Sequence, residues 1–95
     1  MPTILVTLEN TSELPEELFE GIVEEIYDRI VERTPVDTGI CQASWQLVKV
    51  DKDTYELYND TEYVSYLEEG WSQQAPDGMV EVTLAEIPEI MSNIF

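Results

Sequence analysis

The chain of 95 residues has no histidine, a single cysteine, and only four basic residues against twenty-one acidic ones, for a formal net charge of −17. Without histidine, the commonest general base of enzymes is missing, and no Cys–His nucleophile pair can form. One cysteine, Cys41, excludes an internal disulfide and favours a reducing compartment, with Cys41 as a small, partly buried apolar side chain. So few cations exclude binding to phosphate backbones through clusters of Lys and Arg.

The sequence also has no apolar run as long as a membrane-spanning helix requires. No basic segment precedes an apolar stretch at the N-terminus, so we expect no signal peptide and a location in the host cytosol during synthesis. No EF-hand-like spacing occurs, and we expect neither a metal nor a cofactor. Hydrophobic residues still make up 43% of the chain, which predicts one globular domain over residues 1–95.

Periodicity predicts an α+β fold for this domain. Residues 3–8 are β-branched and apolar, which is typical of a strand. From about Leu14 to Arg33, apolar residues recur every four positions while acidic residues occupy the opposite side, as in an amphipathic helix. Ser12 or Thr11 can cap this helix, and Pro35 ends it. We therefore predict a long N-terminal helix packed on a small, mostly antiparallel sheet.

The second half of the chain predicts the remaining strands and helices. Residues 44–50 and 55–58 alternate around a polar turn, which indicates a β-hairpin. A short helix is expected from about Tyr63 to Glu69, followed by a loop and an extended segment over 79–83. The final segment, 84–94, has a helical stripe that Thr83 and Glu86 could begin as a capping box and that Pro88 weakens.

Several residues suit turns and helix caps, because they supply a side-chain acceptor, a fixed φ or a left-handed backbone. These candidates are Pro35, Asp37, Thr38, Gly39, Asn59, Gly70 and Gly78. Asp37-Thr38-Gly39 is also the tripeptide of an aspartic protease, in which two subunits each contribute one aspartate. Here, however, the tripeptide follows a long predicted helix instead of an apolar strand, and the chain has only four glycines and no glycine-rich flap.

A longer pattern offers a different interpretation. Its pieces, in chain order, are Thr34-Pro35-Val36-Asp37-Thr38-Gly39, Ala43-Ser44-Trp45, Asn59, Tyr63, Leu67-Glu68, Gly70, Ser72, Gln74-Ala75-Pro76 and Gly78-Met79-Val80. In order and spacing this pattern resembles the tail-completion, tail-terminator or neck proteins of tailed bacteriophages. The chain departs from many relatives in having Glu81 and Glu86 where basic residues are common, and Trp71 where a smaller residue is usual.

The resemblance implies a subunit that forms a ring, with a hexamer as the expected form, at the head–tail junction of the virion. It also implies contacts with tail-tube and head-closure or connector proteins, passage of DNA without sequence-specific binding, and no catalysis. We expect the loop after Gly70 to dock onto a neighbouring subunit through Trp71. The candidates for the core or for a subunit interface are Trp45, Tyr63, Leu67, Glu68, Trp71, Ser72, Gln74, Ala75, Pro76 and Met79.

Two alternatives stay open at this stage. The strong negative charge also suits an acidic adaptor or inhibitor that mimics DNA on a basic partner. A dimeric aspartic protease that uses Asp37 is the other alternative. Under the ring hypothesis, the charge opposes self-association at low salt, so assembly is expected to strengthen as salt screens it.

Overall fold

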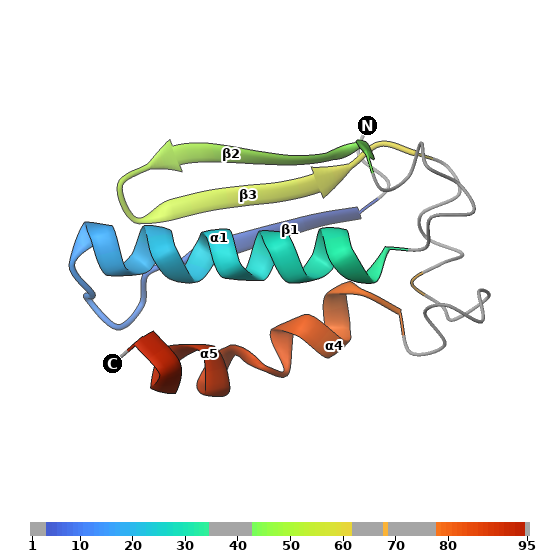
Figure 1. Ribbon diagram of the computed structural model, residues 1–95. Helices are drawn as coiled ribbons and strands as arrows, with labels where there is room; N and C mark the ends of the chain where they lie inside the picture. The colour runs from blue at the N-terminus through green and yellow to red at the C-terminus, as the bar shows by residue number, and fades with distance from the viewer. Residues whose placement is uncertain (1–3, 35–42, 62–67, 69–77, 95) are drawn as a thin grey trace.

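The computed structural model describes residues 4–34, 43–61, 68 and 78–94 (Figure 1). Its elements, in chain order, are β1 (Ile4–Glu9), α1 (Glu16–Arg33), β2 (Trp45–Asp51), β3 (Thr54–Asn59), α4 (Val80–Leu84) and α5 (Ile87–Ile94). The strands form one layer, and the helices lie together in a second layer along the sheet (Figure 1). The predicted α+β class, with its long N-terminal helix on an antiparallel sheet, is confirmed.

The sheet has the order β1-β3-β2, with both neighbouring pairs antiparallel. The predicted hairpin is present as β2 and β3, in a register that pairs Leu47 with Leu57. The first strand of the chain adds to the other side of β3, where Ile4 pairs with Asn59 and Glu9 with Thr54. An irregularity between Lys49 and Asp51 interrupts the β2–β3 ladder near the turn.

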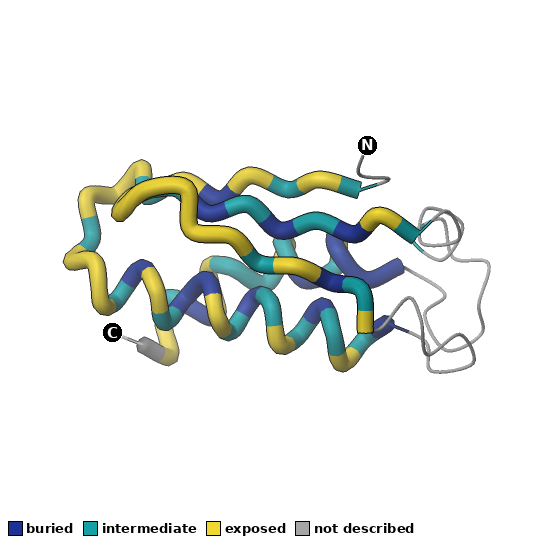
Figure 2. Tube along the Cα trace, turned by 90° about the horizontal axis from the view of Figure 1, so that it is seen from above, coloured by how far each residue is buried: buried dark blue, intermediate teal, exposed yellow. Residues whose placement is uncertain are grey.

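Alternation along β1, β3 and the start of β2 separates an inner face from an outer one, as Figure 2 shows along the tube, whereas the end of β2 is exposed throughout. In β3, Tyr55 and Leu57 point inward and are buried, while in β2 the exposed Val48 points outward. The helices bury their apolar stripes against the inner face. Among the residues that the structure describes, the core contains Leu8, Phe19, Ile22, Val23, Ile26, Ile30, Trp45, Tyr55, Leu57, Met79, Val80 and Ile90.

The first helix begins later than predicted and without the predicted cap. Pro15 occupies the N-cap position, with no hydrogen bond from a capping side chain. Asn10, not Ser12 or Thr11, organises the preceding turn: its side chain accepts from the Leu14 N–H at 2.9 Å and donates to the Leu14 carbonyl at 2.8 Å. The helix ends at Arg33, as predicted.

The C-terminal segment differs from the prediction. The segment over 79–83, predicted as extended, is instead the start of α4. The capping box does not form, because Thr83 lies inside α4 and its hydroxyl donates to the Met79 carbonyl at 2.7 Å. The helical conformation is interrupted at Ala85 and Glu86. Pro88 therefore falls in the first turn of α5, where a missing N–H is tolerated.

Candidate functional site

A buried chain of hydrogen bonds joins the end of α1 to the start of β2. The Trp45 indole N–H donates to Thr34 Oγ1 at 2.7 Å, and the Thr34 hydroxyl donates to the Ile30 carbonyl at 2.8 Å. Both side chains are buried, with Trp45 only 4% exposed. Because buried polar groups are costly without partners, this arrangement fixes how the helix and the strand meet.

A second polar contact holds the start of α4. Glu68 Oε1 accepts from the backbone N–H groups of Met79 at 2.9 Å and Val80 at 2.8 Å, and Oε2 accepts from the Glu81 N–H at 3.0 Å. A helix leaves its first N–H groups without intrahelical partners, and its N-terminus favours negative charge. The Glu68 carboxylate therefore caps α4 from a distant position in the sequence.

Gly78 makes that close approach possible. Its φ is +80°, a left-handed conformation that residues with a Cβ rarely adopt. A Cβ at this position would lie 3.0 Å from Glu68 Cδ and would collide with the Glu68 backbone carbonyl. Glycine is thus required here both by the backbone angle and by the neighbouring Glu68.

Asn59 is the last residue of β3. It is fully buried, and its Oδ1 accepts from the Thr61 N–H at 2.8 Å. This bond to the backbone two residues further along is an Asx turn, which directs the chain as it leaves the sheet.

The structure thus brings together two groups of predicted residues: Trp45 beside Thr34, and Glu68 with Gly78 and Met79. Apart from Asn59, the other predicted turn, core and interface residues lie outside the described residues. They are Pro35, Asp37, Thr38, Gly39, Tyr63, Leu67, Gly70, Trp71, Ser72, Gln74, Ala75 and Pro76.

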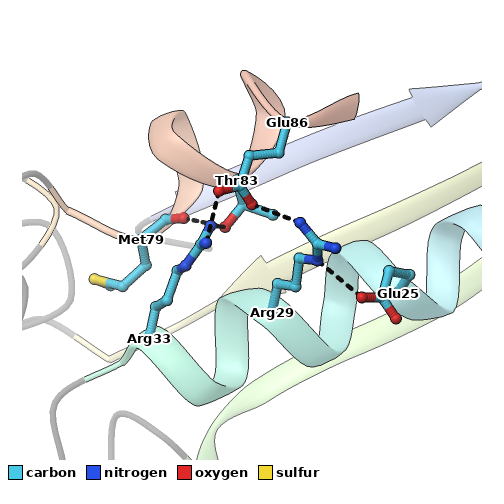
Figure 3. Close-up of polar contacts among 6 residues, drawn as sticks. All are labelled: Glu25, Arg29, Arg33, Met79, Thr83 and Glu86. Atoms are coloured by element: carbon cyan, nitrogen blue, oxygen red, sulfur yellow. Dashed lines mark hydrogen bonds and ion pairs between the residues drawn. The ribbon is translucent and has the colours of Figure 1, made fainter. Parts of the chain in front are cut away.

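A cluster that the sequence did not reveal fastens α1 to the α4–α5 junction (Figure 3). Glu86 accepts from Arg29 Nη1 at 2.8 Å and from Arg33 Nη2 at 2.7 Å. Arg33 also donates to Thr83 Oγ1 at 2.9 Å, and Arg29 Nε pairs with Glu25 at 2.8 Å. The spacing of the two arginines places them on one side of the helix, which was the available signal, but their partner is set by tertiary packing.

These ion pairs shift the protonation of Glu86. The hydrogen bonds from Arg33 and then Arg29 stabilise its charged form and lower the pKa of the Glu86 carboxyl from 4.5 to about 2. On the opposite side of α1, Lys49 donates to Glu16 at 2.7 Å and lowers the pKa of that exposed carboxyl. Three of the four basic residues are therefore engaged in ion pairs with the chain's own carboxylates.

At pH 7, Glu86→Gln is expected to lower the midpoint of thermal unfolding by a few degrees, because Arg29 and Arg33 lose their shared carboxylate. The folded pKa of Glu86 lies below its ordinary value. Its contribution is therefore fully present above about pH 4.5 and is lost as the pH falls through about 2. Circular dichroism should show the midpoints of wild type and variant converging over this range.

Glu89→Gln provides the control, since Glu89 is an exposed carboxylate elsewhere on α5. Its substitution should change the midpoint little at any pH. A Glu86→Gln effect that stayed constant from pH 7 to pH 2 would show that shape, and not charge, is responsible.

Within the described ranges, no group of three or more His, Cys, Asp or Glu side chains is placed to hold a metal ion. The same part of the chain contains no helix of the length and apolarity needed to cross a membrane. The polar contacts described above connect helices, strands and their ends.

Comparison with known proteins identifies the family. Residues 9–70 match a family model described as "Bacteriophage HK97-gp10, putative tail-component". No curated protein and no solved structure gave a significant match. The matched range covers more than half of the chain and includes α1, the β2–β3 hairpin and Glu68, but not α4, which Glu68 caps. The chain therefore belongs to the HK97-gp10-like family of bacteriophage tail components.

Proposed function

We propose that this protein is a structural subunit that forms a ring, a hexamer, at the head–tail junction of a tailed phage. There it completes the tail or joins it to the head, and DNA passes through the ring. The observation that carries this proposal is the family match over residues 9–70. The ordered pattern of turn and cap residues from Thr34 to Val80, which resembles neck and tail-terminator proteins, supports the specific position.

The charge distribution supports passage of DNA without binding. The outward side of α1 exposes six carboxylates, from Glu16, Glu17, Glu20, Glu24, Asp28 and Glu32. Arg29, Arg33 and Lys49 each form an ion pair with a carboxylate of the chain itself, which competes with any binding to phosphates. Affinity for a DNA backbone depends on Lys and Arg that replace its counterions. A ring of such subunits would let DNA slide through and would not retain it.

We also propose that the protein catalyses no reaction. The chain has no histidine, and the polar contacts of Thr34, Glu68 and Glu86 all link structural elements. The aspartic protease alternative requires a dimer in which two copies of Asp37 share a proton. Asp37→Asn tests this alternative, because it would abolish any peptidase activity of the purified protein.

Light scattering on a sizing column, across protein concentration and salt, tests the ring. We expect a mass near six subunits and ring-shaped particles by electron microscopy. Assembly should increase between low and moderate salt, because screening weakens the repulsion between copies that each carry a net charge of −17. A stable dimer would contradict the ring and revive the two-aspartate enzyme. Tight capture of a basic partner by a monomer would favour the acidic adaptor.

A further inference from the structure

The outer face of the sheet carries apolar side chains that no described element covers. Leu5 is 51% exposed, Val48 41% and Val50 52%; Leu5 and Val48 point away from the helical layer, and Val50 lies at the irregularity near the end of β2. The register places Leu5 beside Tyr58 of the central strand, and Val48 beside Glu56. We call these five residues the outer sheet face. Large apolar groups gathered on the surface of a small protein are typical of an interaction site.

A second apolar feature lies in the helical layer. A pocket of about 340 Å³ opens between the end of β1, α1 and α5. Its apolar lining includes Leu14, Phe19, Leu84, Ile87 and Met91, with Asn10 to Ser12 at its rim. We call it the α5 pocket. Apolar atoms that face an unfilled space lose dispersion contacts that a well-packed interior would provide.

Charge selects between the possible partners of the outer sheet face. Two such faces packed on each other would bring Glu56 of both copies together at the centre, which is repulsive. The outward side of α1 is excluded as a partner of the outer sheet face, because its six exposed carboxylates would repel Glu56. The α5 pocket has a mostly apolar lining, with Glu9 as its one acidic residue.

We propose that the outer sheet face of one copy packs onto the α5 pocket of the next copy. Each copy thus carries both the outer sheet face, with its exposed apolar side chains, and the α5 pocket that receives them. A contact between two unlike surfaces repeats from copy to copy and closes into a ring when the rotation fits. This inference rests on the proposed ring and names the surfaces that build it.

The size of the surface predicts how such copies associate. Three paired strands of about six residues present a face of roughly 300 Å². A stable interface buries about 800 Å² per partner. One contact is therefore weak, whereas each copy in a closed ring makes two. Assembly should consequently depend steeply on protein concentration.

Two variants, each altered on one surface only, test the proposal. The sheet-blocked variant combines Leu5→Gln with Val48→Gln, both at exposed positions of the outer face. The pocket-blocked variant is Ser12→Trp, which places a large ring at the exposed rim and leaves the core unchanged. Met91→Gln, inside the pocket, is a second pocket variant. Ala85→Gln with Ser92→Gln is the matched control at exposed positions that line neither surface.

We expect each blocked variant alone to require at least about tenfold more protein for assembly than the wild type, as measured by light scattering. An equimolar mixture of the two should form no ring. One intact face and one intact pocket remain to meet through a single weak contact, so the mixture should form a dimer at high protein concentration, where neither variant does so alone. Circular dichroism confirms that each variant is folded, and the control should assemble like the wild type.

Three results would overturn the proposal. A pocket-blocked variant that dimerises alone would show that two sheet faces pair with each other. Blocked variants that still build rings of wild-type mass would show that the ring uses other surfaces, while the proposed function would stand. A wild type that stays monomeric at every concentration and salt would contradict both the ring and this contact.

Discussion

Replacing Trp45 with alanine is expected to lower the free energy of unfolding by about 3–5 kcal/mol. Trp45 is 4% exposed and belongs to the core cluster that includes Ile30 and Leu57, so alanine leaves a large cavity. Small domains have a total stability of only about 5–15 kcal/mol. Urea unfolding followed by circular dichroism should therefore show a much lower midpoint, or no folded baseline at all.

A milder pair of variants separates packing from hydrogen bonding at Trp45. Trp45→Phe keeps much of the apolar volume but removes the indole N–H that donates to Thr34 Oγ1. Thr34→Val removes the hydroxyl acceptor. The buried Trp45 N–H is then left without this hydrogen bond, which costs about 1–3 kcal/mol. The double variant should cost less than the sum of the two, because the shared bond is lost only once. Strictly additive effects would show that this bond contributes nothing.

Gly78→Ala is expected to destabilise the fold by at least about 2 kcal/mol, because alanine is strained at a left-handed angle. The new Cβ would also collide with the Glu68 backbone and move the carboxylate that caps α4. Thermal and urea unfolding would both record the loss.

Gly21→Ala is a matched control with the opposite expected sign. Gly21 lies in the middle of α1, and a Cβ there would meet nothing within 4 Å. Alanine lowers the entropy of the unfolded chain and favours helix, so it should stabilise the protein by about 0.5–1 kcal/mol. If both substitutions destabilise the protein, the space above Gly21 is not free; if neither does, the Glu68 contact is dispensable.

The sequence could predict those parts of the fold whose structure is determined by residues close together in the chain. The four-residue apolar period and Pro35 located α1 to within two residues at each end. Alternation on both sides of a polar turn identified the β2–β3 hairpin, in which the structure buries Trp45 and exposes Val48. In these segments, the residues that determine the structure are neighbours in the chain.

The predictions from sequence were wrong where the local structure is determined by residues distant in the chain. The start of α4 contains valines, which favour strands, but its N–H groups are capped by Glu68. Glu86 seemed suited to a capping box, yet Arg29 and Arg33 take both of its oxygens. Neither partner can be located without the tertiary fold. Within the candidate site, the motif included Trp45, Glu68 and Gly78, while their actual contacts came only from the structure. The turn at Asp37–Gly39 and the role of Trp71 stay predictions.

The pairing of β1 with β3 has a consequence for how the protein is made. Among the described strands, β1 hydrogen-bonds only to the central strand β3, which is synthesised about half the chain later. During synthesis, β1 therefore stays unpaired for seconds while α1 and the hairpin are produced. The strand is apolar and uncharged up to Glu9. Closing this long-range pair is expected to be the slow step of folding. Until then, the strand is exposed to other nascent copies, and the dense negative charge that follows it would help to keep those copies apart.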